Sequence, residues 1–200
     1  MRSLSARDNL AVRLRKAFLL LGYEAPTMGD LAKTCGLTRR ALYHHVSSKE
    51  EAFRLALLQD NDAAIVKALQ AGRALMVQDA GPAEVFIEIM NVRYGDSRRE
   101  LAASPHGTEF NAESFIRGRD IMIETAVRFQ ADLAELAGEM EERGQLRLNA
   151  GTTPALLAQM LCDGARGAIQ ALPPVVVADL PNRYRLMCGA ILFGCARPGA

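Results

Sequence analysis

The sequence has no hydrophobic run long enough to cross a bilayer. Its longest apolar stretches, such as residues 17–21 and 175–178, are far shorter than the roughly 20 residues that a transmembrane helix needs. Residues 1–10 mix charged with polar side chains and contain no apolar core of the kind found in a secretory signal peptide. We therefore expect a protein of the cytoplasm that does not enter a membrane.

Side chains that catalyse reactions or bind metals are few and scattered. The four cysteines form no Cys-x-x-Cys pair, and each is typical of a small buried hydrophobe, with a disulfide or a metal site as the alternative. Two of the three histidines are adjacent, and there is no Gly-x-Ser-x-Gly turn or phosphate-binding glycine loop. We predict no catalytic residue, no metal and no cofactor. An enzyme with a helical, largely apolar active site is the alternative.

No segment shows the alternation of apolar and polar residues that a strand needs, and helical periodicity dominates. Residues 10–21 place leucine or alanine every three or four positions on one face, whereas Arg13 and Arg15 fall elsewhere on the wheel. This predicts an amphipathic helix with its charges outside, ending at Gly22. Residues 95–107 are mixed. Further helices are expected at about residues 27–34, 38–45, 48–72, 82–94, 115–140, 154–172 and 181–195. The predicted fold is all-α.

The longest periodic pattern runs from Phe115 to Met140 and steps by three and four residues, which predicts one long helix. Arg119 interrupts this apolar stripe. A charge that is buried without a partner is costly, so we expect a group that neutralises it. That group is an acidic side chain such as Asp163 or Glu88, or an anionic group on a ligand.

The charge is unevenly distributed along the chain. Residues 1–50 carry nine Lys or Arg and four Asp or Glu, whereas the remainder is net acidic. A basic head on an acidic body favours a polyanionic partner. Within this head, residues 27–46 read as two short helices joined by a tight turn. Leu31 and Leu42 face inward, Gly36 supplies the turn and Thr38 caps the second helix, which predicts a helix-turn-helix.

The second of these helices leaves polar and basic side chains on its outer face: Arg39, Arg40, Tyr43 and His44. Arginine can donate two hydrogen bonds to a guanine edge, and hydroxyls suit phosphate oxygens. Lys49 lies in the first turn of the next helix, where its charge opposes the helix dipole, so we infer a phosphate partner outside the protein. The alternative is that Tyr43 and His45 only pack the module.

These residues resemble the DNA-binding domain of the TetR family of transcriptional regulators, over roughly residues 10–55. Departures are Val46 where the family commonly has Phe, Cys35 where it has Ala, and Gly29. Weaker similarity follows at residues 142–147 and 163–164. The matching residues are Thr27, Leu31, Ala32, residues 36–38, residues 42–46, Lys49, Glu50 and Phe53. The resemblance implies that Thr27, Thr38, Tyr43, His44 and Lys49 hold the DNA backbone while Arg39 and Arg40 read bases.

The resemblance also implies a three-helix DNA-binding domain at residues 1–47 and a helical effector-binding and dimerisation domain at residues 48–200. The homodimer would form through the helices 154–172 and 181–195. Leu157, Leu161 and Gly164 share a face there, and the alternative is that this face packs inside the monomer. Such a dimer would bind a near-palindromic double-stranded operator.

The effector implied by the resemblance is a small molecule that we do not identify from the sequence, and the protein is expected to act as a repressor. Residues expected to line its cavity are Phe86, Met90, Arg93, Arg119, Met122 and Phe129. Ordinary core packing is the alternative for the apolar members of this set. A helical adaptor whose basic head binds an acidic protein is the alternative for the whole chain.

Overall fold

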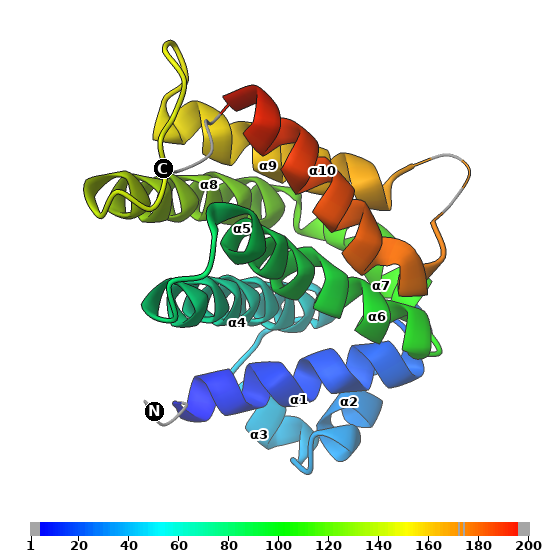
Figure 1. Ribbon diagram of the computed structural model, residues 1–200. Coiled ribbons are helices and arrows are strands. Elements are labelled where there is room, and N and C mark those ends of the chain that lie inside the picture. Colours follow the sequence, from blue (N-terminus) through cyan, green and yellow to red (C-terminus); the bar gives the residue numbers. More distant parts are fainter. Residues whose placement is uncertain (1–4, 172, 174, 196–200) are drawn as a thin grey trace. The chain divides into compact units, whose positions relative to one another are not determined.

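The computed structural model describes residues 5–171, 173 and 175–195, and every element within them is a helix. Figure 1 shows these helices in chain order. They are α1 (Ala6–Leu21), α2 (Met28–Thr34), α3 (Arg39–Tyr43), α4 (Lys49–Val77), α5 (Pro82–Met90), a π-helix (Asn91–Gly95), α6 (Asp96–Ala103), α7 (Gly107–Arg117), α8 (Arg119–Glu142), α9 (Pro154–Ile169), a 3-10 helix (Val177–Asp179) and α10 (Leu180–Cys195). The all-α prediction is confirmed. Among the residues described, none of the helices combines the length and apolarity that crossing a bilayer would require.

The helices form two compact units. The first comprises the chain up to Ala63 together with Arg99–Thr125. Its core joins α1, α2 and α3 to the start of α4 and to α7, around a cluster of rings from Phe18, Tyr23, Phe53 and Phe110. Their centroids lie 5.0–5.2 Å apart along the contacts that Phe53 makes with the other three. The helix-turn-helix segment therefore shares one core with a segment that follows it by more than 50 residues.

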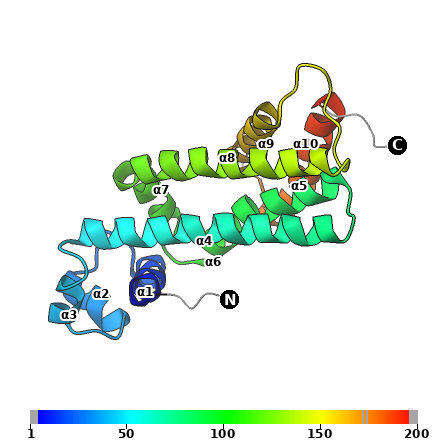
Figure 2. The same ribbon diagram turned by 90° about the vertical axis from the view of Figure 1, so that its left-hand side faces the viewer.

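The second unit comprises Ala64–Arg98 and the chain from Ala126 onward. Its core is formed by α5, the second part of α8, α9 and α10. Fully buried side chains within it include Phe86, Ile89, Phe129, Leu133 and Tyr184. Figure 2 shows α4 and α8 running alongside each other, and ion pairs join these two helices in each unit: Arg54–Asp120 in the first and Arg73–Glu139 in the second. The domain boundary after residue 47 stays a prediction about the DNA-binding module, whereas the compact units divide α4 after Ala63.

The long helix expected from Phe115 to Met140 is instead two helices, because the chain leaves helical geometry at Gly118. Glycine is the poorest helix former after proline, so a break there costs little. Arg119 becomes the first residue of α8 and is exposed, as is Phe115. The expectation of a buried charge at Arg119 is therefore wrong, and this side chain needs no acidic partner. Asp163, one of the partners considered for it, pairs with Arg166 at 2.8 Å.

Two smaller expectations also change. The mixed stretch after Tyr94 is helical, since α5 continues through the π-helix into α6. Arg15, expected on the outer face of α1, is 8% exposed. Its Nε lies 2.7 Å from Asp60 and its Nη1 lies 2.5 Å from Glu100, so α1, α4 and α6 meet at one guanidinium. The apolar stripe of α1 gave no sign of this because both acidic partners are distant in sequence.

Candidate nucleic-acid interface

The first helix of the helix-turn-helix begins at a complete capping box. Thr27 Oγ1 accepts a hydrogen bond from the Asp30 backbone N–H at 3.2 Å, and the Asp30 carboxylate accepts from the Thr27 N–H at 2.9 Å and from its hydroxyl at 2.6 Å. These hydrogen bonds lower the pKa of Asp30, so its charge is present at the positive end of α2. Leu31 and Ala32, one turn further on, are buried in the core of the first unit.

The turn into α3 is made by Gly36, whose φ of 65° lies in the left-handed region that glycine adopts most easily. The Leu37 N–H donates to Ala32 O at 2.8 Å, and Arg13 of α1 donates to Cys35 O at 2.8 Å. Thr38 then caps α3 by accepting from the Ala41 N–H at 3.1 Å. The predicted turn and cap are confirmed.

Packing fixes which face of α3 reaches solvent. Leu42 and Val46 are buried in the core of the first unit, as predicted. The opposite face carries exposed side chains: Arg39, Arg40, Tyr43 and His44. The guanidinium of Arg39 lies 5.5 Å above the ring of Tyr43. Neither arginine makes a hydrogen bond or an ion pair to another described residue, so both keep all their donors for an external acceptor.

His45 is exposed too, which contradicts the expectation that it packs the module. Sequence reasoning also passed over Lys33 and Thr34, which are exposed at the end of α2. Their position just before the glycine of the turn was the available signal, since that end of α2 lies next to the helix that the turn presents. Tyr43 is 43% exposed, so the alternative that it only packs the module is wrong, while its contact with DNA stays a prediction.

Lys49 is in a different environment from the one expected. Its Nζ donates to Glu24 O at 3.0 Å and to Pro26 O at 3.2 Å, and it lies 5.0 Å from the centre of the Tyr23 ring. The inference that a lysine in the first turn of α4 requires an outside partner is therefore wrong. Two carbonyl oxygens and an aromatic face compensate its unfavourable position on the helix dipole.

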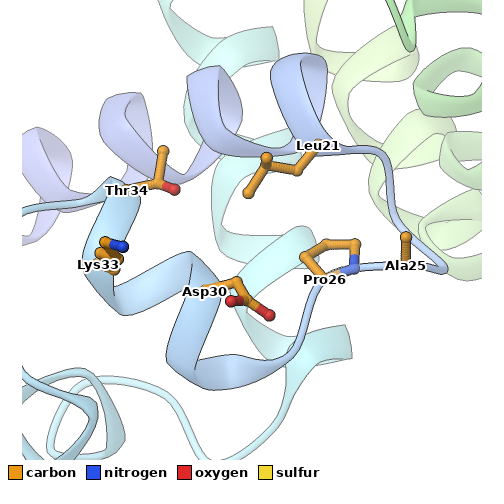
Figure 3. A pocket seen from close by; sticks show the side chains of 6 residues that line it. All are labelled: Leu21, Ala25, Pro26, Asp30, Lys33 and Thr34. Carbon is orange, nitrogen blue, oxygen red and sulfur yellow. The ribbon is translucent and has the colours of Figure 1, made fainter.

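A hollow of about 520 Å³ opens on the surface of the first unit, beside the connection between α1 and α2. Figure 3 shows its lining. The residues are Leu21, Ala25, Pro26, Asp30, Lys33 and Thr34. The connection is therefore packed against the protein on one side and open on the other.

The residues expected around an effector divide between the two units. Phe86, Met90 and Phe129 are buried in the core of the second. Arg93 is buried there as well, with its guanidinium 5.2 Å from the ring centre of Tyr94 and 5.5 Å from that of Phe129. Met122 packs against the core of the first unit, and its sulfur accepts from Asn61. No group of three or more His, Cys, Asp or Glu in the described ranges is arranged to hold a metal ion.

The predicted dimer helices exist as α9 and α10, but their predicted contact face is turned inward. Leu157 and Leu161 are fully buried, and Gly164 lies against Met187 and Ile191 of the same chain. The close approach that the small residue permits is therefore made by α10 of its own chain, as the alternative had it. Leu172 of that predicted face lies outside the described residues. The outward sides of the two helices instead expose other apolar side chains: Leu156, Met160, Leu186 and Phe193.

Comparison with known proteins agrees with this architecture. Residues 14–55 match the family model described as bacterial regulatory proteins, tetR family. No curated protein matches the chain.

Solved structures match over almost the whole length. A protein from Mesorhizobium loti assigned to the TetR family of transcriptional regulators is 18% identical, with a TM-score of 0.70 over 98% of this chain and 100% of its own. NemR of E. coli in its reduced form is 19% identical (TM-score 0.64, 96% and 98% covered). SmeT, the repressor of the Stenotrophomonas maltophilia multidrug efflux pump SmeDEF, is 16% identical (TM-score 0.62, 98% and 92% covered). The chain therefore shares their fold along its length.

Proposed function

We propose that the chain is a transcriptional regulator of the TetR family, whose model matches residues 14–55 and whose fold it shares. In this proposal it represses transcription from a near-palindromic operator and releases that operator when a small molecule binds. It would do so in the cytoplasm, where chromosomal DNA is accessible. The observation that carries the proposal is the outer face of α3, where Arg39 and Arg40 are exposed and keep their donors for an external acceptor.

The chemistry of this face suits a major groove. An α-helix fits that groove, and a guanidinium can donate two parallel hydrogen bonds to the O6 and N7 of guanine. We assign base reading to Arg39 and Arg40, and phosphate contacts to Thr27, Thr38, Tyr43 and His44. Thr27 and Thr38 already cap α2 and α3, so the phosphate contacts assigned to them are weaker than those of a free hydroxyl.

A dimer is supported by the outward sides of α9 and α10. Leu186 and Phe193 are 64% and 83% exposed, which is unfavourable for large apolar side chains unless another surface covers them. A second copy of the chain would cover both helices symmetrically and place two α3 helices about one duplex turn apart. We propose this outward face as the interface, in place of the face through Leu157 and Leu161.

The effector would bind in the second unit. Phe86, Met90, Arg93 and Phe129 come together in its core, and an effector with an apolar body would contact them after the core opens. Met122 packs against the core of the first unit and is not included in this site. The exposure of Arg119 removes the reason for which it was included.

The test starts by selecting bound duplexes from a random pool with the purified chain. We expect a near-palindromic sequence, and a dimer that makes about 6–10 phosphate contacts should lose roughly 10³–10⁵ in affinity between 50 and 200 mM salt. Binding to no duplex at low ionic strength would refute the proposal in favour of the adaptor.

Variants then test the reading face. Arg39→Ala and Arg40→Ala should each reduce the preference for operator over scrambled duplex by about 5- to 160-fold, since a bidentate pair contributes about 1–3 kcal/mol of discrimination. Arg143→Ala is the matched control, because Arg143 is equally exposed but belongs to the second unit. Equal losses in all three variants would exclude base reading by α3. Release by a small molecule is tested separately, by adding cell metabolites to the operator complex.

A further inference from the structure

The connection between α1 and α2, residues 22–26, is held in place by side chains from two other helices. We call it the α1–α2 corner. From α7, Glu109 Oε1 accepts hydrogen bonds from the backbone N–H groups of Tyr23 at 2.8 Å and Glu24 at 3.0 Å. From α4, Lys49 donates to two carbonyl oxygens of the same corner. The polar backbone of the corner is thus bonded through its donors to α7 and through its acceptors to α4.

Two further contacts strengthen the attachment to α7. The guanidinium of Arg117 lies 4.1 Å from the centre of the Tyr23 ring and 3.2 Å from the Glu24 carboxylate. The second oxygen of Glu109 lies 2.8 Å from Nδ1 of His106. The backbone N–H of His106 donates to Leu19 O at 3.2 Å. These contacts join the end of α1 and the corner to both ends of α7.

Position 22 requires a glycine because Glu109 and His106 approach its backbone closely. A β-carbon at that position would lie 2.5 Å from Oε2 of Glu109 and 2.8 Å from Nδ1 of His106, and the residue has a φ of 81°. Only glycine allows α7 to approach so closely with this backbone. On its other side the corner lines the hollow of Figure 3, so the polar contacts with α4 and α7 determine where it sits.

The position of the corner matters because α2 begins directly after it, at the Thr27 cap, and α2 carries the turn that presents α3. The chain enters the segment 99–125 from the second unit and returns to the second unit after it.

We propose that Glu109 and Arg117 are positioning residues for DNA binding: through the α1–α2 corner, α7 sets the angle at which α3 is presented to the operator. The inference rests on the proposed function and deepens it. It makes α7 a working part of the DNA-reading head, together with residues 1–47.

For substitution of Glu109, the proposal and simple charge effects predict opposite changes in DNA affinity. Removing a negative charge from a DNA-binding head would by itself raise affinity for a polyanion. We expect the opposite for Glu109→Ala, which should bind the full operator about tenfold more weakly because two charge-assisted hydrogen bonds are lost. Glu124→Ala is the matched control, since Glu124 is an exposed carboxylate of the same unit on α8. It should bind at least as tightly as the wild-type chain.

A half-site duplex separates positioning from general damage to the head. A single half-site engages one head, which can rotate to fit, so Glu109→Ala should bind it as the wild-type chain does. Both N–H groups of the corner donate to the same oxygen, Glu109 Oε1. Glu109→Gln keeps an oxygen that can accept both hydrogen bonds but removes the charge that strengthens them, and should lie between wild type and Glu109→Ala on the full operator. Arg117→Ala should repeat the pattern of Glu109→Ala, and thermal unfolding identifies any variant whose head does not fold.

Full-operator affinity for Glu109→Ala and Glu109→Gln that equals or exceeds that of Glu124→Ala would overturn the proposal. An equal loss on half-site and full operator by the folded variants would overturn it as well. If the wild-type chain binds no duplex, the proposed function itself is refuted. If the wild-type chain binds the operator and substitution of Glu109 leaves that affinity unchanged, only the role of α7 is refuted.

Discussion

Replacing Arg15 should destabilise the protein more than any other removal of a charge from α1. Its side chain is buried between the carboxylates of Asp60 and Glu100, and its guanidinium lies 5.7 Å from the ring centre of Phe110. The two acidic groups keep the pKa of this arginine raised despite the opposing effect of burial, which is the largest influence on it. Arg15→Met retains most of the apolar stem and removes the charge.

The size of this destabilisation depends on how far the two acidic partners of Arg15 are exposed to water. Breaking a buried ion pair by removing one partner costs about 3–5 kcal/mol when the remaining charge stays buried. The side chain of Asp60 is 26% exposed and that of Glu100 is 52% exposed, so water solvates part of the charge left behind. We therefore expect Arg15→Met to lower the free energy of unfolding by about 2–3 kcal/mol.

Urea unfolding followed by circular dichroism measures this loss. Lys16→Met is the control, because Lys16 is an exposed cation on the same helix, and it should change stability by less than about 0.5 kcal/mol. Adding Asp60→Asn to Arg15→Met should restore at least half of the loss, since the double variant no longer has the carboxylate that faced the Arg15 guanidinium. If Arg15→Met were as stable as Lys16→Met, the ion pairs would contribute nothing and the reasoning would fail.

Two further predictions concern the turn and an exposed ion pair. Gly36→Ala should lower the free energy of unfolding by about 1–2 kcal/mol, because Gly36 has a left-handed backbone. Gly138 lies in the interior of α8 with open space around it, so Gly138→Ala should raise the free energy of unfolding by about 0.5–1 kcal/mol. Urea unfolding of both variants measures the difference. Two hydrogen bonds from Arg54 lower the pKa of Asp120 to about 2, so this pair stabilises the folded state above pH 4 and its contribution is lost as the pH falls from about 4 to 2. A carboxyl resonance of Asp120 that titrates near pH 4 in the folded chain, or an acid sensitivity unchanged in Asp120→Asn, would contradict this.

The helix-turn-helix was predictable from the sequence because its determinants are local. Thr27 and Thr38 cap helices that begin at the next residue, and Gly36 bends the chain within one turn. Leu42 of α3 is buried, and so is Val46, which follows the end of that helix by three residues. Each of these signals acts over fewer than ten residues, so the sequence around the motif contains the information that folds it.

The incorrect expectations for Arg15 and Lys49 arose because their partners are distant in sequence. Arg15 and Lys49 were interpreted from the helix on which each lies, and in both cases the deciding groups belong to another part of the chain. Arg119 differs, because the helix breaks at its neighbour Gly118. Asp60 and Glu100 make Arg15 an interior residue, and the carbonyls of Glu24 and Pro26 compensate Lys49. A helical wheel shows the faces of a single helix and contains no information about the helices that pack against it.

The sequence by itself determined that this chain is helical, that it has a helix-turn-helix near residues 27–46, and that Arg39 and Arg40 face away from the core. Tertiary structure alone decided that α7 packs into the same core as the helix-turn-helix and bonds to the α1–α2 corner. It also decided which apolar side chains of α9 and α10 stay exposed. The physical reason is range: caps, turns and apolar spacing act between near neighbours, whereas ion pairs and helix-packing faces depend on residues brought together only when the chain folds.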